Sequence, residues 1–321
     1  MGNKLIGIDI GGTSVKIGVL DINGSIIQKW EIKTRKENKG INVVSDIWKS
    51  INAELTWNEI NNEVIGIGVG APGFVSQQTG MVYEAVNIGW KNYRLKEKLQ
   101  SLTNLPVFVE NDANLAALGE NWKGAGNNTN DIIVITLGTG VGSGIIANGE
   151  LLSGINGTAG EIGHIIVDRN GLPCNCRRRG CLDTIASGPG VVYKAMKVIE
   201  KYPTSDLAKF YESEGDITSK DVFQLARKGN QLCQGIVKDI TDILGYAIAA
   251  VSSVTNPSKI LIGGGLSNSE EQLLDAVNIS FEKYSLPRVF QSCKLEIAKL
   301  GNDAGIIGAA YLVKKLKQSS T

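Results

Sequence analysis

Histidine and cysteine side chains gather in one part of the sequence. His164 lies upstream of Cys174, Cys176 and Cys181, which form a C-x-C-x4-C run, and it is the only histidine of the chain. Three thiolates and one imidazole make a closed tetrahedral set of the kind that Zn²⁺ favours at structural sites. Three free thiols in the core are the alternative. We predict a structural zinc ion bound by these four side chains.

A glycine-rich loop near the start of the chain has the composition of a phosphate-binding turn. Asp9 ends an apolar run, and Gly11, Gly12 and Thr13 follow it. Thr13 offers a hydroxyl group and Lys16 a positive charge to an anion. Glycines let backbone N–H groups point at a phosphate, and a carboxylate can hold Mg²⁺ through water. Taken alone, such a loop is as often only a tight turn.

Two further glycine clusters predict other nucleotide contacts. Gly138, Thr139 and Gly140 repeat the pattern of the first loop, and Gly264 with Gly265 follows a strand, where an adenine can lie against the backbone. A tight connection between a strand and a helix explains the last cluster nearly as well. Neither Gly/Thr loop has Walker A spacing or a G-x-G-x-x-G with a downstream acid, which argues against P-loop and Rossmann sites.

An acid at the end of a predicted strand is the candidate general base. Asp112 follows the run Val107–Glu110 and Asn111, and it leads into a helix. Open α/β sheets bind ligands at the carboxyl ends of their strands. Phosphoryl transfer to an alcohol needs a carboxylate that accepts the hydroxyl proton. The competing interpretation is a helix N-cap, which is the commoner role of such a residue.

Strands alternate with helical patterns along the chain, which predicts an α/β fold with helices on both faces of a sheet. Residues 131–152 repeat the order of residues 5–27: a strand, a Gly/Thr turn, a strand, an Asn-Gly hairpin and a strand. Further on, Thr218 with Asp221 predicts a helix start, and Ile236–Val254 predicts a buried helix. The repeat predicts two similar halves with a cleft between them.

The charge balance excludes bulk electrostatic attraction as the basis of function. The 321 residues carry 33 Lys and Arg and 32 Asp and Glu, a formal net charge of +1, so we expect no nucleic-acid or membrane binding. The start of the chain does not resemble a signal peptide, and we expect a cytoplasmic protein without a membrane span. Its five cysteines are not expected to form disulfides there.

With these motifs in order, the chain resembles the ROK family of bacterial sugar kinases and sugar-responsive repressors, most closely its glucokinases. The resemblance covers nearly the whole sequence and rests on Asp9–Lys16, Gly70–Gly73, Ala85–Trp90, Glu110–Asp112, Leu137–Gly142, Glu161–His164 and the cysteine run. It implies two actin-like (ribonuclease H-like) α/β domains with an interdomain cleft. The expected small domain is 1–112 with 303–321, and the larger one is 113–302.

The resemblance also implies an activity, ATP-dependent phosphorylation of glucose to glucose 6-phosphate, with Mg²⁺, a structural Zn²⁺ and a homodimer. Asp112 would be the general base on the 6-hydroxyl. The other sugar contacts would be Gly73, Asn87, Asn111, Glu161, His164 and Asp183. The ATP contacts would be Asp9, Gly11, Gly12, Thr13, Lys16, Gly138, Thr139, Gly140, Gly264 and Gly265. His164 would hold zinc with one ring nitrogen and face the sugar with the other.

Two positions depart from the family's pattern. Arg177 stands where the family usually has Gly, and Asp183 stands where it usually has Glu. Because Asp183 is one methylene shorter, fructose, mannose, allose and N-acetylmannosamine stay open as acceptors. A sugar-sensing repressor and an actin-like scaffold ATPase are the alternatives outside the kinases. Only about four residues precede the first strand, so we expect no helix-turn-helix that reads DNA.

Overall fold

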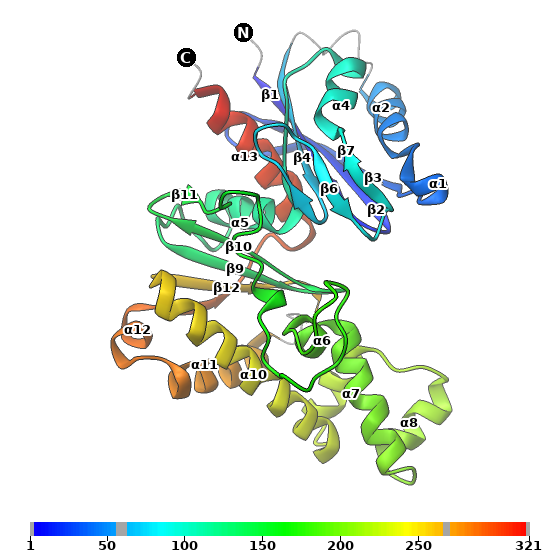
Figure 1. Ribbon diagram of the computed structural model, residues 1–321, viewed down its shortest axis with the longest axis vertical. Helices are drawn as coiled ribbons and strands as arrows, with labels where there is room; N and C mark the ends of the chain where they lie inside the picture. The colour runs from blue at the N-terminus through cyan, green and yellow to red at the C-terminus, as the bar shows by residue number, and fades with distance from the viewer. Residues whose placement is uncertain (1–2, 56–62, 266–269, 319–321) are drawn as a thin grey trace. The chain divides into compact units, whose positions relative to one another are not determined.

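The structure is a computed structural model that describes residues 3–55, 63–265 and 270–318, and it contains two compact units (Figure 1). Unit 1 comprises Met1–Asn130, Gly144–Gly160 and Lys299–Thr321, and unit 2 comprises Asp131–Ser143 and Glu161–Ala298. These units divide the chain at other residues than the boundaries expected from the sequence. The expected pair of folding domains stays a prediction.

The first sheet forms from the apolar runs at the start of the chain. Its strand order is β3-β2-β1-β4-β8, with β4 parallel to β1 and β8, and with β2 antiparallel to β1 and β3. The bounds are β1 Lys4–Ile10, β2 Ser14–Asp21, β3 Ile26–Lys33, β4 Val64–Ala71 and β8 Val107–Asn111. A smaller sheet follows β4 with the order β5-β6-β7, from Phe74–Val75, Val82–Ala85 and Trp90–Tyr93.

Helices cover both faces of the first sheet. They are α1 Glu37–Gly40, α2 Val43–Glu54, α4 Leu95–Thr103, α5 Asp112–Lys123 and α13 Ala304–Gln318, with the 3-10 turn η4 Gly301–Asp303 before α13. Ile6 and Ile8 pack in the core with α2 and α4, whereas Leu5 faces the core that contains α13. Figure 1 shows α13 lying along β1 and β4. A Cβ at Gly7 would lie 2.0 Å from the Ile306 carbonyl oxygen, so only glycine allows this close approach.

The second sheet repeats the strand order of the first, which confirms the repeat predicted from the sequence. Its order is β11-β10-β9-β12-β13, with β12 parallel to β9 and β13 and with β10 antiparallel to β11. The bounds are β9 Ile132–Leu137, β10 Val141–Ala147, β11 Glu150–Leu151, β12 Lys259–Gly263 and β13 Lys294–Ile297. In each sheet the Gly/Thr loop connects the first two strands.

Unit 2 is mainly helical after the cysteine run. Its helices are α6 Asp183–Ala186, α7 Gly188–Lys201, α8 Asp206–Glu214, α9 Ser219–Arg227, α10 Gln231–Thr255, α11 Glu270–Tyr284 and α12 Pro287–Ser292, and η2 Ile162–His164 is a 3-10 turn. Thr218 and Asp221 form a capping box at the start of α9, as predicted. Helices α10 and α11 lie side by side (Figure 1). Within the described ranges, no helix is both long and apolar enough to span a membrane.

Candidate active site and metal centre

The junction of β8 and α5 positions the candidate base. Asn111 ends β8 and caps α5, because its Oδ1 accepts hydrogen bonds from the N–H groups of Ala113 (2.9 Å) and Asn114 (3.1 Å). Asp112 is therefore the first residue of the helix and not its N-cap. Its Oδ1 accepts a further hydrogen bond from Ala113 N–H at 2.9 Å.

A second acid lies at the same end of the sheet. Strand β4 runs between β1 and β8, and a Cβ built at Gly70 would lie 3.4 Å from Asp9 Oδ1 and 3.6 Å from Asp112 Cα. Burial raises the pKa of Asp9, and the charge of Lys16 opposes this shift. The structure thus brings Asp9 and Asp112 together at the carboxyl end of β4, where parallel sheets bind ligands.

The first glycine loop closes on itself beside Asp9. Gly11 N–H donates to the Ser14 carbonyl at 2.9 Å. Lys16 follows on β2, and its Nζ donates to Asn302 Oδ1 at 3.1 Å. The predicted ATP contacts of unit 1 therefore lie together: Gly11, Gly12 and Thr13 form the turn, and Asp9 and Lys16 are paired residues of the strands that flank it.

The predicted sugar contacts of unit 1 join the same region. Asn111 Nδ2 donates to the Gly73 carbonyl at 3.1 Å, so the capping residue also holds the turn after β4. Asn87 approaches the first glycine loop, since a Cβ at Gly12 would lie 3.3 Å from Asn87 Cβ. Gly73, Asn87 and Asn111 thus lie around the strand ends that carry Asp9 and Asp112.

Glu110 is a buried residue of this site that received no role in the sequence analysis. Its side chain lies on β8 and is 1% exposed. Its Oε1 accepts hydrogen bonds from Asn111 N–H (2.8 Å) and Asn114 Nδ2 (3.0 Å), and its Oε2 accepts one from Gln77 Nε2. The carboxylate therefore fixes the backbone immediately before Asp112. Its only signal in the sequence is an acid within an apolar run.

Replacing Glu110 by Gln is expected to lower the free energy of unfolding by about 1–3 kcal/mol. The amide supplies one acceptor oxygen in place of two, and a buried donor left unpaired costs about 1–3 kcal/mol. Urea denaturation measures the change. Glu97→Gln is the control, because Glu97 is exposed and its ion pair with Arg94, at 3.4 Å, is a contact of small effect. Equal midpoints for both variants would contradict the role given to Glu110.

In unit 2 the predicted sugar contacts lie beside the second glycine loop. Asp183 Oδ1 accepts a hydrogen bond from Val141 N–H at 2.7 Å, and a Cβ at Gly140 would lie 2.9 Å from the same oxygen. Burial raises the pKa of Glu161; the nearby charge of His164 lowers it, and that of Asp183 raises it further. Glu161, His164 and Asp183 are thus electrostatic neighbours.

The predicted adenine contact also reaches the second loop. Gly264 has a φ of 95°, and a Cβ there would lie 2.3 Å from the carbonyl oxygen of Leu137, the residue that begins the loop. On its other side, Gly188 N–H at the start of α7 donates to the Gly138 carbonyl at 2.8 Å. Within unit 2, the two glycine clusters therefore adjoin each other.

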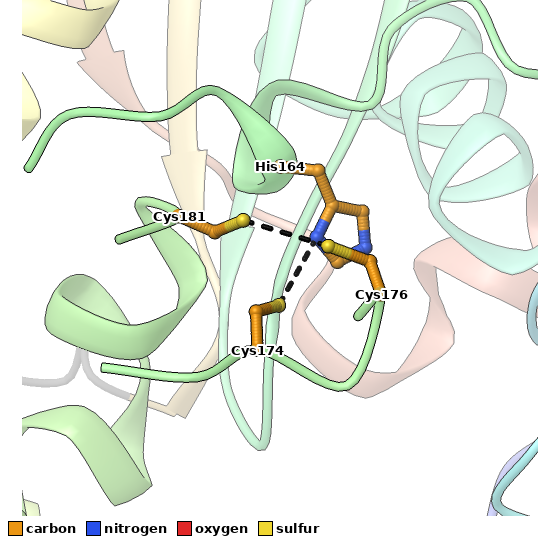
Figure 2. Close-up of side chains that lie close together, drawn as sticks. All are labelled: His164, Cys174, Cys176 and Cys181. Atoms are coloured by element: carbon orange, nitrogen blue, oxygen red, sulfur yellow. Dashed lines mark hydrogen bonds between the residues drawn. The ribbon is translucent and has the colours of Figure 1, made fainter. Parts of the chain in front are cut away.

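The four predicted metal ligands converge (Figure 2). His164 Nδ1 lies 3.6 Å from Cys174 Sγ, Cys176 Sγ lies 3.5 Å from Cys181 Sγ, and all four ligand atoms lie within 4.8 Å of one another. Tetrahedral zinc with Zn–S bonds near 2.3 Å separates its sulfur ligands by about 3.8 Å. The donor set and its spacing fit Zn²⁺.

Local hydrogen bonds build the loop that carries the thiols. Cys174 N–H donates to the Arg178 carbonyl (2.8 Å), and Arg177 N–H donates to the Cys174 carbonyl (2.9 Å). Arg177 has a φ of 69°, a left-handed conformation that glycine adopts more easily. Burial acts to raise the pKa of Cys176, but hydrogen bonds from Arg178 and the neighbouring thiols lower it to about 6. Burial raises the pKa of Cys174, and it raises that of Cys181 to about 12, so these two thiolates would form only as the metal ion binds.

Two sheets of equal strand order, each with a Gly/Thr loop between its first two strands, define an α/β protein of the actin-like ATPase fold. The ROK family model matches residues 5–316. The chain belongs to the ROK family.

Similar proteins include kinases and a regulator. A glucokinase of Halalkalibacterium halodurans is 46% identical over 316 residues, which cover 98% of this chain and 96% of that protein. A crystal structure of a ROK family glucokinase from Streptomyces griseus in complex with glucose and AMPPNP is 34% identical; it has a TM-score of 0.82 and is matched over 97% of this chain and 99% of that one. A ROK family transcriptional regulator, a homolog of the E. coli MLC protein, is 28% identical with a TM-score of 0.86, over 98% of this chain and 78% of that one.

Proposed function

We propose that the chain is an ATP-dependent glucokinase, which transfers the γ-phosphoryl group of ATP to the 6-hydroxyl of glucose. The observation that carries the proposal is that Asp9 and Asp112 both lie next to Gly70 at the end of β4, in a chain that matches a glucokinase at 46% identity over nearly its whole length. One acid can accept a proton while the other binds a metal–nucleotide complex, which are the two carboxylate roles that phosphoryl transfer to an alcohol requires.

In the proposed reaction, Asp112 accepts the proton of the sugar hydroxyl while the hydroxyl oxygen of the sugar bonds to the γ-phosphorus. The bond between that phosphorus and the β,γ-bridging oxygen breaks, and ADP leaves. Asp9 would hold Mg²⁺ through water, which neutralises charge on the phosphates. The loop Gly11–Thr13 with Lys16 would bind phosphate oxygens through N–H, hydroxyl and ammonium donors.

The remaining contacts with ATP and the sugar are proposed from unit 2, where the two glycine clusters and the four candidate metal ligands lie. Gly138, Thr139 and Gly140 would bind phosphate, and Gly264 with Gly265 would lie against the adenine. Glu161, His164 and Asp183 would bind sugar hydroxyls, together with Gly73, Asn87 and Asn111. A Zn²⁺ ion held by His164 and the three cysteines would fix the loop that carries these sugar ligands.

The proposal also covers the oligomeric state, the location and the partners of the protein. We infer a homodimer in the cytoplasm, with no nucleic acid as partner. The resemblance to ROK kinases, which commonly form dimers, supports the assembly.

Phosphorylation of a sugar panel with Mg²⁺ and ATP tests the activity. Glucose is expected to give the highest kcat/KM among glucose, mannose, fructose, allose and N-acetylmannosamine. Asp183, one methylene shorter than the family's usual Glu, favours the alternative of another hexose or N-acetylmannosamine as acceptor. A panel in which one of these exceeds glucose would support that alternative. ATP turnover without phosphorylation of any sugar would overturn both.

Asp183→Glu is expected to lower the KM for glucose, and Asp183→Ala is expected to raise it about tenfold. A hydrogen bond to a charged group contributes about 1.5–3 kcal/mol. Because the side chain of Asp183 is shorter than Glu, its hydrogen bond to the sugar contributes only a part of this free energy. Turnover should change less, because these hydroxyls lie away from the reacting one. Steady-state kinetics measures both parameters.

Asp183→Asn is the matched control that separates the loss of the carboxylate charge from the loss of the hydrogen bond to the second glycine loop. Its amide oxygen can still accept the hydrogen bond from Val141 N–H, which measures 2.7 Å in the parent. A raised KM in the Asn and Ala variants alike assigns the effect to lost charge at the sugar. If KM rises only in Asp183→Ala, the residue acts by holding the loop, and the sugar contact is wrong.

A further inference from the structure

The segment 34–40 is attached to the first glycine loop at its beginning. Thr34 N–H donates to the Thr13 carbonyl at 2.9 Å, and Thr34 Oγ1 donates to the Gly11 carbonyl at 2.8 Å. Thr34 is 3% exposed, so both hydrogen bonds are shielded from water. The backbone that leads into Lys36 is therefore fixed relative to the turn proposed to bind phosphate.

The same segment is attached at its other end to the turn that carries Asn87. Trp90 Nε1 donates to the Gly40 carbonyl at 3.1 Å. A Cβ at Gly40 would lie 2.5 Å from Ile88 Cγ2, so the two turns are in close contact. Between the two ends, the Arg35 guanidinium forms an ion pair with Asp46 of α2, with its Nε 2.6 Å from Asp46 Oδ2. Residues 34–40 thus bridge the glycine loop and the Asn87 turn.

Lys36 extends from this bridge toward the point where the two turns meet. A Cβ at Gly12 would lie 3.9 Å from Lys36 Nζ and 3.3 Å from Asn87 Cβ. Gly12 has no side chain, so the space beside its Cα stays open. The Lys36 ammonium group, the Asn87 side chain and the loop backbone border this space. Among the residues that the structure describes, no carboxylate forms an ion pair with Lys36.

We propose that Lys36 is a further catalytic residue, whose ammonium group binds the phosphoryl group during its transfer. The inference rests on the proposed function, in which Gly12 binds phosphate and Asn87 binds sugar. The place where these two residues meet is where the γ-phosphoryl group and the acceptor hydroxyl would meet. Charge spreads over the three equatorial oxygens in the transition state, and a positively charged donor aimed at them lowers the barrier. Lysine supplies such a point charge.

Lys36→Met tests the assignment, since methionine keeps an unbranched side chain without the charge. We expect kcat to fall about 10- to 100-fold, the loss of one charged hydrogen bond, while the KM for glucose stays within about threefold. Lys36→Arg should recover part of the lost turnover. Lys49→Met is the matched control, because Lys49 is an exposed lysine of the same unit on α2, and it should keep the parental kcat.

Nucleotide binding separates this inference from the sugar kinase proposal. Because Lys36 would contact only the terminal phosphoryl group, Lys36→Met should weaken binding of AMPPNP with Mg²⁺ by about threefold or more and leave ADP binding unchanged. Calorimetry measures both without any sugar. If no sugar is phosphorylated but this difference appears, the role of Lys36 stands and the glucokinase proposal fails. An unchanged AMPPNP-to-ADP affinity ratio in Lys36→Met would overturn the inference, whatever happens to the activity.

Discussion

Asp112→Asn is expected to lower kcat for glucose phosphorylation about 10²–10⁴-fold and to leave the KM for glucose nearly unchanged. The amide keeps the size of the side chain and loses only its ability to accept the hydroxyl proton, and general-base catalysis typically contributes this factor. Asn111 remains as the cap of α5, so the helix start should persist. Steady-state kinetics of the purified variant, with circular dichroism to verify folding, measures the effect.

Asp206→Asn is the matched control for this change. Asp206 is likewise the first residue of a helix, α8, and is capped by the residue before it, Ser205. It is exposed and lies outside the proposed site, so its replacement tests whether a charge at a helix start matters for turnover in itself. A kcat near the parental value in Asp112→Asn would overturn the assignment of the base.

The elements with local signals were predicted well. The Gly/Thr loops and the Asn-Gly hairpins mark where strands turn, so the repeat predicted two halves that begin alike, and the structure shows two sheets of like strand order. The capping box at Thr218 and Asp221 was equally visible, because it is a contact between near neighbours. The sheet of β5, β6 and β7 was not predicted, since strands of two to four residues are too short to show a period.

The residues of the site also divide into those that a local sequence pattern predicted and those that it did not. The metal ligands were found because three of the four lie within one short run, and the structure places their donor atoms together. The hydrogen bond from Gln77 to Glu110 joins residues 33 apart, and the approach of Lys36 to Gly12 depends on how β3 leaves the first sheet. Neither contact has a local pattern, because pairing of strands determines both.

One departure from the family's sequence has a structural explanation. Arg177 has a φ of 69°, and the left-handed conformation costs a residue with a Cβ more than it costs glycine. The usual glycine at this position would adopt the turn without strain. Arg177 adopts this left-handed conformation itself, and the four ligands lie together beside it.

Cys176→Ser is expected to remove most of the zinc and to raise the KM for glucose about tenfold or more, with a smaller effect on kcat. The parent should contain about one zinc per chain when purified without added metal. A serine hydroxyl is a poor ligand for Zn²⁺ compared with a thiolate, and loss of even an outer partner of a metal site costs about 10- to 100-fold in affinity. His164 would then lose the ion that orients it, and Glu161 and Asp183 the loop that positions them. Elemental analysis and steady-state kinetics measure the two effects.

Cys293→Ser is the control, because it removes a buried thiol that lies outside the cluster. Cys293 follows α12 and does not belong to the group of His164, Cys174, Cys176 and Cys181, whose donor atoms lie together. The control should keep its zinc and its KM. The pattern in Cys176→Ser, a change in KM more than in kcat, is the reverse of that expected for Asp112→Asn, since one change affects sugar binding and the other proton transfer. A fully active parent protein without zinc would show that the four side chains hold no structural metal, and the sugar loop would then owe its shape to its hydrogen bonds alone.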